Sequence, residues 1–502
     1  MSESRPLMQL RRVKKYFSIR RKVRLRALRD INFTLYEGEK FGVVGESGCG
    51  KSTLGKVMLQ LYPPSGGDCL YYGHSLAAFC PGYLKKEIRR LLQLQKKAKI
   101  YAENAAKAKD NEARNLAMKL NHRYLREGSK TVGSLILCQN LSHIVGLFTE
   151  AHKETTCAHR LLNIAMKLEA KAEKWERSCR GAASSWREAA AAKREIAQKH
   201  EDNAEGLRKE AFAYRGKNFD PSVSKRAPEK EYQDKLDSNF ETGISLSKLT
   251  GSELKSLRRE MQMVFQDPSA SLDPRQAVGK AIEEVFKIHT NLSADERREK
   301  VMALLERVGL KREHYNYYPH ALSGGQKQRV CIARAIATDT RLVVLDESLS
   351  ALDVSVQAQI LSLLEELSGD GRTYLFITHD LGVAKYFCHR IMVMYLGCEC
   401  EMASSEELFV NPLHPYTQSL LAAIPRPVVR EVDYDAPVLE GEVPNALHPP
   451  SGCFFHTRCN RVMDICKKEQ PVLWELKKDH FAACHLYDAG EKNSDSEASN
   501  EL

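Results

Sequence analysis

The stretch GESGCGKST, residues 45–53, has the residue types and spacing of a loop that binds nucleotide phosphates. Its glycines let backbone N–H groups point at phosphate oxygens, Lys51 can reach the β- and γ-phosphates, and the Ser52 hydroxyl can ligate Mg²⁺. A buried strand, FGVV, precedes the loop and a helical stretch, LGKVMLQL, follows it, which disfavours a chance match in a glycine-rich turn. The nucleotide-binding candidates are Gly45, Glu46, Ser47, Gly48, Cys49, Gly50, Lys51, Ser52 and Thr53, the last at a helix N-terminus.

A second stretch suits the same chemistry. The apolar segment RLVVLDE reads as a strand that ends in two acids, Asp346 and Glu347. Asp346 is placed to hold Mg²⁺ through water, and Glu347 to polarise the water that attacks the γ-phosphate. Such a strand alone is weak evidence, but downstream of a phosphate-binding loop it supports the same site.

A third stretch, LSGGQKQR at Leu322 to Arg329, resembles the signature motif of the ATP-binding cassette (ABC) ATPases. The other motifs of that family follow in order. Gln266 in VFQDP matches the Q-loop, and His379 in ITHD matches the switch histidine. Phe17 matches the aromatic residue that stacks on adenine, although Tyr16 stands beside it. The remaining match, to the D-loop, is Ser350-Ala351-Leu352-Asp353.

This resemblance implies ATP and Mg²⁺ as cofactors and assigns roles to the matching residues. Glu347, His379 and Gln266 are the catalytic candidates, with His379 at the γ-phosphate, and Ser52, Gln266 and Asp346 are the magnesium ligands. The signature residues of the family cap the ATP bound by a facing second domain; here they are Ser323, Gly324, Gly325 and Gln326. Because the chain has one phosphate loop and one signature motif, the resemblance implies half of a dimer that ATP closes and hydrolysis reopens.

Three longer stretches are similar to the oligopeptide/dipeptide (and nickel) importers of that family. They are MQMVFQDPSASLDPR, ESLSALDVSVQAQIL and NPLHPYTQSLLAAIP, and the first looks like the F-type ATPase subunit. The resemblance implies ATP-driven import of di- or oligopeptides or a related small solute. Its implied partners are a D-type ATPase subunit, with which this chain would form a heterodimer, two membrane permeases whose coupling helix docks near residues 266–275, and an extracellular solute-binding protein. Ser348 departs from the usual proline, without an expected effect on the chemistry.

The elements that position these residues alternate between strand and helix outside one long helical segment. We therefore expect an α/β fold: an ABC-type P-loop ATPase domain with a mostly helical insertion and a small cysteine-containing C-terminal extension. The expected boundaries are 1–78 and 247–400 for the two parts of the ATPase domain, 79–246 for the insertion, 401–487 for the extension and 488–502 for a disordered acidic tail.

Composition indicates a globular protein that is not inserted in a membrane, with 43% apolar and 28% charged residues. No apolar run reaches the ~18–20 residues of a membrane span, and the N-terminal stretch has no apolar core of a secretory signal. We therefore expect the protein to stay in the cytosol, with its 14 cysteines reduced. The resemblance to importer ATPases implies a peripheral position on the cytoplasmic face of the cell membrane.

The insertion carries the chain's excess positive charge. Residues 81–250 hold 34 Lys and Arg against 22 Asp and Glu, whereas the whole chain has a net charge of +11. The simplest interpretation is a solvated accessory module without an activity of its own, with Trp175 and Trp186 in its core. A docking arm for an unknown partner, or a basic patch for anionic lipid or nucleic acid, is the alternative.

A DNA-acting ABC ATPase is the rival interpretation of the whole chain, since those proteins also carry long helical interruptions. Three features disfavour it. The insertion precedes the Q-loop, it shows no sustained heptads, and NPLHPYTQSLL is an importer feature. We therefore expect no nucleic-acid partner.

Four cysteines, Cys453, Cys459, Cys466 and Cys484, gather near the C-terminus. Their spacing differs from the close pairs of common zinc sites, and by spacing alone structural cysteines and metal ligands are equally favoured. Importer ATPases carry a similar GCxFxxRC…C…CH segment that holds a [4Fe–4S] cluster, so the resemblance favours a cluster over zinc. His456 and His485 are expected to be hydrogen-bonding neighbours, and the cluster to be structural and remote from the ATP chemistry.

Overall fold

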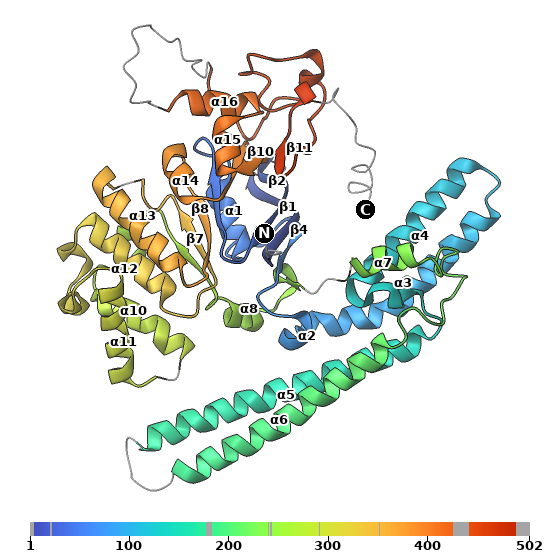
Figure 1. Ribbon diagram of the computed structural model, residues 1–502, viewed down its shortest axis with the longest axis horizontal. Coiled ribbons are helices and arrows are strands. Elements are labelled where there is room, and N and C mark those ends of the chain that lie inside the picture. Colours follow the sequence, from blue (N-terminus) through green and yellow to red (C-terminus); the bar gives the residue numbers. More distant parts are fainter. Residues whose placement is uncertain are drawn as a thin grey trace. The chain divides into compact units, whose positions relative to one another are not determined.

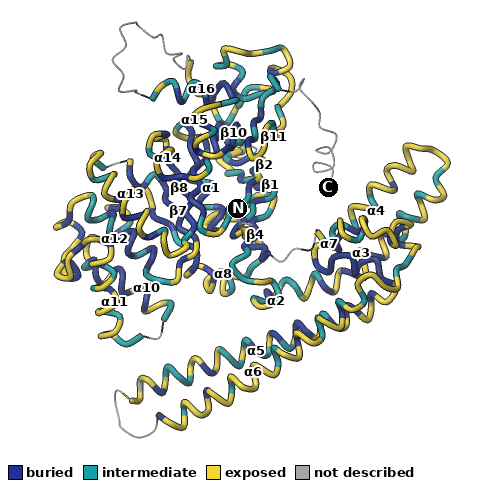
Figure 2. The backbone as a smooth tube through the Cα atoms, in the orientation of Figure 1, coloured by how far each residue is buried: buried dark blue, intermediate teal, exposed yellow. Residues whose placement is uncertain are grey.

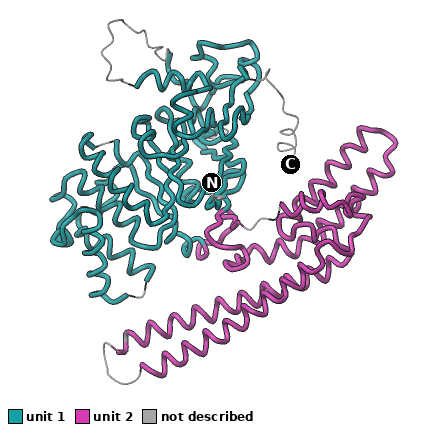
Figure 3. The backbone as a smooth tube through the Cα atoms, in the orientation of Figure 1, with its two compact units in different colours: residues 1–70, 254–502 teal, residues 71–253 magenta. Residues whose placement is uncertain are grey.

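The computed structural model describes residues 5–20, 23–176, 183–238, 240, 243–290, 292–350, 352–424 and 441–487. The expected acidic tail and Ala351 lie outside these residues. The chain divides into two compact units (Figure 3): one comprises residues 1–70 and 254–502, and the other residues 71–253. The second unit starts and ends a few residues outside the 79–246 expected for the insertion.

The first unit is built on a mostly parallel sheet, as the strand–helix alternation predicts (Figure 1). In the described residues its order is β11-β12-β10-β9-β3-β8-β7-β6. The parallel strands are β9 (Arg390–Tyr395), β3 (Lys40–Val44), β8 (Thr373–Ile377), β7 (Leu342–Asp346) and β6 (Met261–Val264). The antiparallel strands are β10 (Cys398–Ser404), β12 (His480–Ala482) and β11 (Trp474–Lys477). Every residue of β3, β7 and β8 is buried, as in a sheet covered on both faces.

A second, antiparallel sheet contains the N-terminal strands. β1 (Pro6–Arg20) pairs with β2 (Val23–Tyr36), and β4 (Gly66–Tyr71) lies on the other edge of β1. Buried and solvent-facing residues roughly alternate along β1 and β2, which is the pattern of strands with one face on a core. This sheet carries Phe17 near the end of β1.

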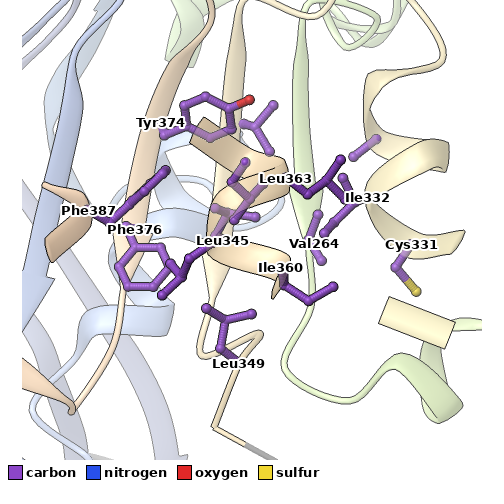
Figure 4. Close-up of a cluster of buried hydrophobic side chains, with 14 of the residues drawn as sticks. Val264, Cys331, Ile332, Leu345, Leu349, Ile360, Leu363, Tyr374, Phe376 and Phe387 are labelled. Atoms are coloured by element: carbon purple, nitrogen blue, oxygen red, sulfur yellow. The ribbon is translucent and has the colours of Figure 1, made fainter. Parts of the chain in front are cut away.

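The core of the first unit lies between the parallel sheet and its helices. In Figure 4, Leu345 of β7 and Phe376 of β8 face Ile360 and Leu363 of α13, with Ile332 of α12 beside them. Burial of such side chains contributes about 1.5–3 kcal/mol each. The helices of this part of the chain are α1 (Lys51–Met58), α8 (Gly251–Leu257), α9 (Pro268–Ser271), α10 (Val278–His289), α11 (Ala294–Arg307), α12 (Gly324–Ile336), α13 (Val354–Ser368), α14 (Leu381–Phe387), α15 (Ser405–Val410) and α16 (Pro415–Ala422).

The second unit is mostly helical, as its alanine-, lysine- and glutamate-rich sequence predicts. Its helices are α2 (Leu76–Phe79), α3 (Gly82–Lys107), α4 (Asn111–Val132), α5 (Leu141–Glu176), α6 (Ala183–Phe212) and α7 (Lys230–Ser238). Leucine, isoleucine and valine side chains of α3, α4, α5 and the turn Gly133–Leu137 form one apolar core. Among the described residues, no helix combines the length and the apolar character that crossing a membrane requires.

Helices α5 and α6 form a long antiparallel pair whose contact line is made of alanine (Figures 1 and 2). The buried alanines recur every seven residues, at Ala151, Ala158, Ala165 and Ala172 on α5 and at Ala183, Ala190, Ala197, Ala204 and Ala211 on α6. A strict seven-residue repeat is the pattern of a coiled coil, and small side chains allow two helices to approach closely. The expectation that this segment lacks sustained heptads is therefore wrong.

The two tryptophans of this pair do not form its core. Trp175 is 48% exposed, so the expectation of a core position is wrong for that residue. Trp186 is half-buried and packs under the ammonium group of Lys171, 5.2 Å from the ring centre. Both lie near the end of the pair, where the alanine positions leave no room for a large side chain between the helices.

Candidate nucleotide-binding site

The phosphate-binding loop joins β3 to α1, where the sequence predicts it. Gly45 and Gly50 have φ angles of 151° and 105°. A Cβ atom at Gly45 would lie 2.3 Å from the carbonyl oxygen of Met394, and one at Gly50 would lie 2.5 Å from that of Ala27. Only glycine fits these two positions, because a side chain there would displace a neighbouring backbone.

Lys51 lies at the centre of this loop. Its ammonium group donates hydrogen bonds to the carbonyl oxygens of Gly45, at 2.8 Å, and Glu46, at 3.0 Å. The side chain is 3% exposed and its Nζ atom lies 3.6 Å from Oε1 of Glu347. The loop therefore holds a buried cation where a phosphate would need one.

Two of the three residues expected to ligate magnesium, Ser52 and Asp346, are in contact. The Ser52 hydroxyl at the start of α1 donates a hydrogen bond to Oδ1 of Asp346 at the end of β7, at 2.6 Å. Burial raises the pKa of Asp346 above its ordinary value, while the Ser52 hydrogen bond and the charge of Lys56 oppose this effect. A hydroxyl and a carboxylate at one point are ligands that suit Mg²⁺.

The catalytic candidates converge on the carboxylate of Glu347. Gln266, which follows β6, donates a hydrogen bond from Nε2 to Oε2 of Glu347 at 3.0 Å. Nδ1 of His379, which follows β8, lies 3.8 Å from the same oxygen. Glu347 has a φ of 45°, in the left-handed region that a non-glycine residue adopts only at an energetic cost. Parallel strands bring these residues together because their carboxyl ends lie at one edge of the sheet.

Ser348 follows this carboxylate and is buried. Its hydroxyl has no hydrogen-bond partner among the residues that the structure describes. It makes no bond to Glu347 or to the phosphate-binding loop. The expectation that serine in place of the usual proline leaves the chemistry unaffected stays a prediction.

One pocket extends from the loop to Phe17. Phe17 lines this pocket, and its ring packs edge-on against Tyr62 with centroids 5.4 Å apart. Tyr16 does not line it, and instead lies under the guanidinium group of Arg26. The sequence missed six lining residues that no motif marks: Leu25, Arg26, Ala27, Leu396, Gly397 and Ala446. The predicted residues among the lining are Phe17, Ser47, Gly48, Gly50, Lys51, Ser52, Thr53, Gln266 and Glu347.

The signature residues do not line this pocket. Ser323 precedes α12 and is exposed, and its hydroxyl accepts a hydrogen bond from the N–H of Gln326 at 3.3 Å. The Gln326 side chain in turn accepts one from the N–H of Ser323 at 2.9 Å, which completes a capping box. The D-loop residue Ser350 stays close to the site, donating its hydroxyl proton to the carbonyl oxygen of Glu347 at 2.8 Å.

The C-terminal cysteines gather in one place. Burial, with smaller contributions from the neighbouring thiols of Cys459 and Cys466, raises the pKa of Cys453 and Cys484 to about 11. Backbone N–H groups point at these sulfurs, among them that of Arg461, 3.4 Å from Sγ of Cys459. Within the described ranges, no three His, Cys, Asp or Glu side chains are close enough to hold one metal ion.

The two histidines of this region are hydrogen-bonding neighbours, as expected. Nδ1 of His456 lies 2.8 Å from the carbonyl oxygen of Cys453, and Nε2 of His485 lies 3.0 Å from that of Glu469. Neither contact involves a sulfur atom.

The cysteine segment is not remote from the ATP site, and that expectation is wrong. Strands β12 and β11 of this segment extend the same sheet that carries the phosphate-binding loop. The guanidinium group of Arg458 also bonds the carboxylate of Glu46 in that loop. The sequence separation of these two residues hides their proximity.

Comparison with known proteins agrees with this geometry. A family model described as "ABC transporter" matches residues 28–143 and 231–350, and one described as "Oligopeptide/dipeptide transporter, C-terminal region" matches residues 400–466. The chain is 48% identical over 250 residues to the oligopeptide transport ATP-binding protein AppF of Bacillus subtilis, which covers 49% of this chain and 75% of that protein. It is 45% identical over 254 residues to the di/tripeptide transport ATP-binding protein DppF of Pseudomonas aeruginosa, covering 47% and 76%.

Proposed function

The chain belongs to the ATP-binding proteins of the oligopeptide/dipeptide ABC transporters. On that premise we propose that the pocket between Phe17 and Glu347 binds MgATP and hydrolyses it to power peptide import. The observation that carries this proposal is the convergence of Lys51, Gln266 and His379 on Glu347. This arrangement places a phosphate-binding cation beside the carboxylate that would activate water.

Each residue of the site has a role in this reaction. Lys51 binds the β- and γ-phosphates, and Ser52 and Asp346 hold Mg²⁺, with Gln266 as a third ligand. Glu347 orients and polarises the attacking water, and His379 contacts the γ-phosphate. Catalysis by such a site consists mainly of positioning and of electrostatic stabilisation of the phosphoryl oxygens.

The signature residues serve a second subunit. Ser323 and Gly324 are exposed and lie outside the lining of the chain's own pocket. This supports an ATP sandwich in which they cap the nucleotide of a facing D-type ATPase subunit. The assembly would include two permeases and, through them, an extracellular solute-binding protein, with this chain peripheral on the cytoplasmic face of the membrane.

Co-purification tests this assignment. A tagged chain, produced in its own cells, is expected to bring down membrane permeases and a second ATPase from detergent-solubilised membranes. A Lys51→Ala variant should co-purify equally but bind ATP at least tenfold more weakly, because the phosphate cation is lost. Retention on double-stranded DNA without the permeases would instead favour the rival function, to which the α5–α6 coiled coil is suited.

We propose that the four cysteines hold a [4Fe–4S] cluster, which the resemblance favours over one zinc ion. Their thiols lie near one another, and backbone N–H groups point at the sulfurs. A cluster carries its four thiolates on separate iron atoms, and hydrogen bonds to sulfur are typical of such sites. Bound there, the cluster would crosslink Cys453, Cys459, Cys466 and Cys484 and so stabilise the segment.

We propose that residues 71–253 form an accessory module. Its apolar core lies within its own helices, and the catalytic residues all belong to the other unit. Deleting residues 80–245 is therefore expected to leave the ATPase rate of the assembled transporter within about twofold, measured as phosphate release.

A shorter deletion separates folding from function. Removing residues 161–197, which form the outer part of the α5–α6 pair, and closing the gap with a glycine-rich turn leaves the apolar core of the module in place. Both variants should retain peptide uptake by intact cells. Loss of uptake in the shorter deletion, with normal assembly, would show that the coiled coil is required for transport.

A further inference from the structure

The C-terminal extension holds Glu46, the second residue of the phosphate-binding loop, at two points. The backbone N–H of Glu46 donates a hydrogen bond to the hydroxyl of Tyr416 at 2.9 Å. Its carboxylate accepts two from Arg458, from Nη1 at 2.7 Å and from Nη2 at 3.0 Å. Two parallel N–H···O bonds of this kind fix orientation as well as distance.

Arg458 is itself rigidly held. Its side chain is 5% exposed, against 24% for Glu46. Nη1 also lies 3.4 Å from the hydroxyl of Tyr395, to which it donates. The ring of Phe455 packs against Tyr395 and Tyr416, with centroids 5.4 and 5.2 Å apart, and so ties the segment before Arg458 to the same place.

The ion pair bears directly on the phosphate site. The carbonyl oxygen of Glu46 accepts a hydrogen bond from Lys51, so the position of residue 46 also affects the phosphate-binding cation. An unpaired carboxylate here would repel the phosphates, and partial burial weakens the screening of that repulsion by water. Arg458 neutralises this carboxylate with two hydrogen bonds and so holds it in one position.

We propose that Arg458 is a positioning residue for the phosphate-binding loop, and that the cysteine segment sets the affinity of the site for ATP through the Arg458–Glu46 pair. Arg458 immediately precedes Cys459 in the chain. A change in the conformation of the cysteine site therefore moves Arg458, and through the Arg458–Glu46 pair it changes the position of the loop. This inference rests on the proposed nucleotide site.

Removing the guanidinium group tests the proposal. Arg458→Met keeps an unbranched apolar stem similar to that of arginine and removes the charged guanidinium group. The Kd for MgATP, measured by calorimetric titration of the full chain, is expected to rise roughly tenfold, since one carboxylate beside the phosphates is left unpaired. In the assembled transporter KM should rise by a similar factor while kcat changes less than about twofold, because Arg458 does not contact Glu347, Gln266 or His379.

A second substitution distinguishes this role from a general effect on folding. In the double variant Arg458→Met with Glu46→Gln, the carboxylate is gone, and the Kd should return to within about threefold of the wild-type value. Arg458→Lys should rescue in part, because it restores the charge without the paired geometry. A matched control is Lys467→Met, whose cation follows Cys466 and pairs with Asp464 of its own segment; its Kd should not change.

The outcomes are separable. An unchanged Kd in Arg458→Met, or a double variant as weak as the single one, would overturn the proposal. If Arg458→Met does not fold, the other two variants still test the proposal. Arg458→Lys should bind MgATP more weakly than the wild-type chain, and the double variant should have a Kd within about threefold of the wild-type value. Failure of the wild-type chain to bind MgATP would count against the proposed nucleotide site instead.

Discussion

Substitution of Glu347 by glutamine is expected to leave MgATP binding nearly unchanged and to lower the rate of ATP hydrolysis at least about 100-fold. The amide has almost the same size as the carboxylate and can still accept the hydrogen bond that Gln266 donates. It cannot polarise water as a carboxylate does, and it loses the ionic contact with Lys51. ATP would therefore bind and close the dimer, but the closed state would persist.

Phosphate release by the assembled transporter, together with size-exclusion chromatography in MgATP, measures both effects. The variant should elute as a nucleotide-bound dimer with its partner ATPase, whereas the wild-type assembly returns to the open state. Glu365→Gln is the matched control, because Glu365 lies in the same unit and its carboxylate pairs with Lys40 away from the site. Normal hydrolysis by the Glu347 variant would exclude this residue as the activating base.

The sequence predicts which residues gather around Glu347 because each of them belongs to a local motif at a strand end. The loop from Gly45 to Ser52 has its conformation determined by its own glycines. Gln266 and His379 each follow an apolar strand, and Asp346 is the last residue of one. Parallel strands place such residues at one edge, so the site can be inferred without knowing the strand order.

The parts that the sequence does not predict depend on contacts between distant segments. Leu396 and Gly397 line the pocket from the turn between β9 and β10, and no motif marks them. Arg458 meets Glu46 across 412 positions of the chain. The coiled coil is missed for a different reason, since its repeat consists of alanine, while a search for apolar periodicity weighs large side chains.

Loss of any one of the four gathered cysteines is expected to prevent binding of the proposed [4Fe–4S] cluster. Cys466→Ser is the most informative change, because Cys466 is buried and its carbonyl oxygen accepts the N–H of Cys453 at 2.7 Å. Serine keeps that backbone bond and the size of the side chain, and removes only the thiolate. Anaerobically purified wild-type protein should contain about four iron atoms and four acid-labile sulfides per chain, and the variant should contain essentially none.

Cys398 provides the matched control for that substitution. It is half-buried and lies near Cys453, but it belongs to β10 and not to the gathered set. Cys398→Ser should therefore keep its iron and its brown colour, while Cys466→Ser should unfold at a lower temperature because the crosslink of the segment is lost. Zinc in place of iron in the wild-type protein would contradict the cluster, as would a colourless protein without sulfide.

If iron is bound, the Cys466 variant should also bind MgATP more weakly than the Cys398 variant, because a loosened segment no longer holds Arg458 against Glu46.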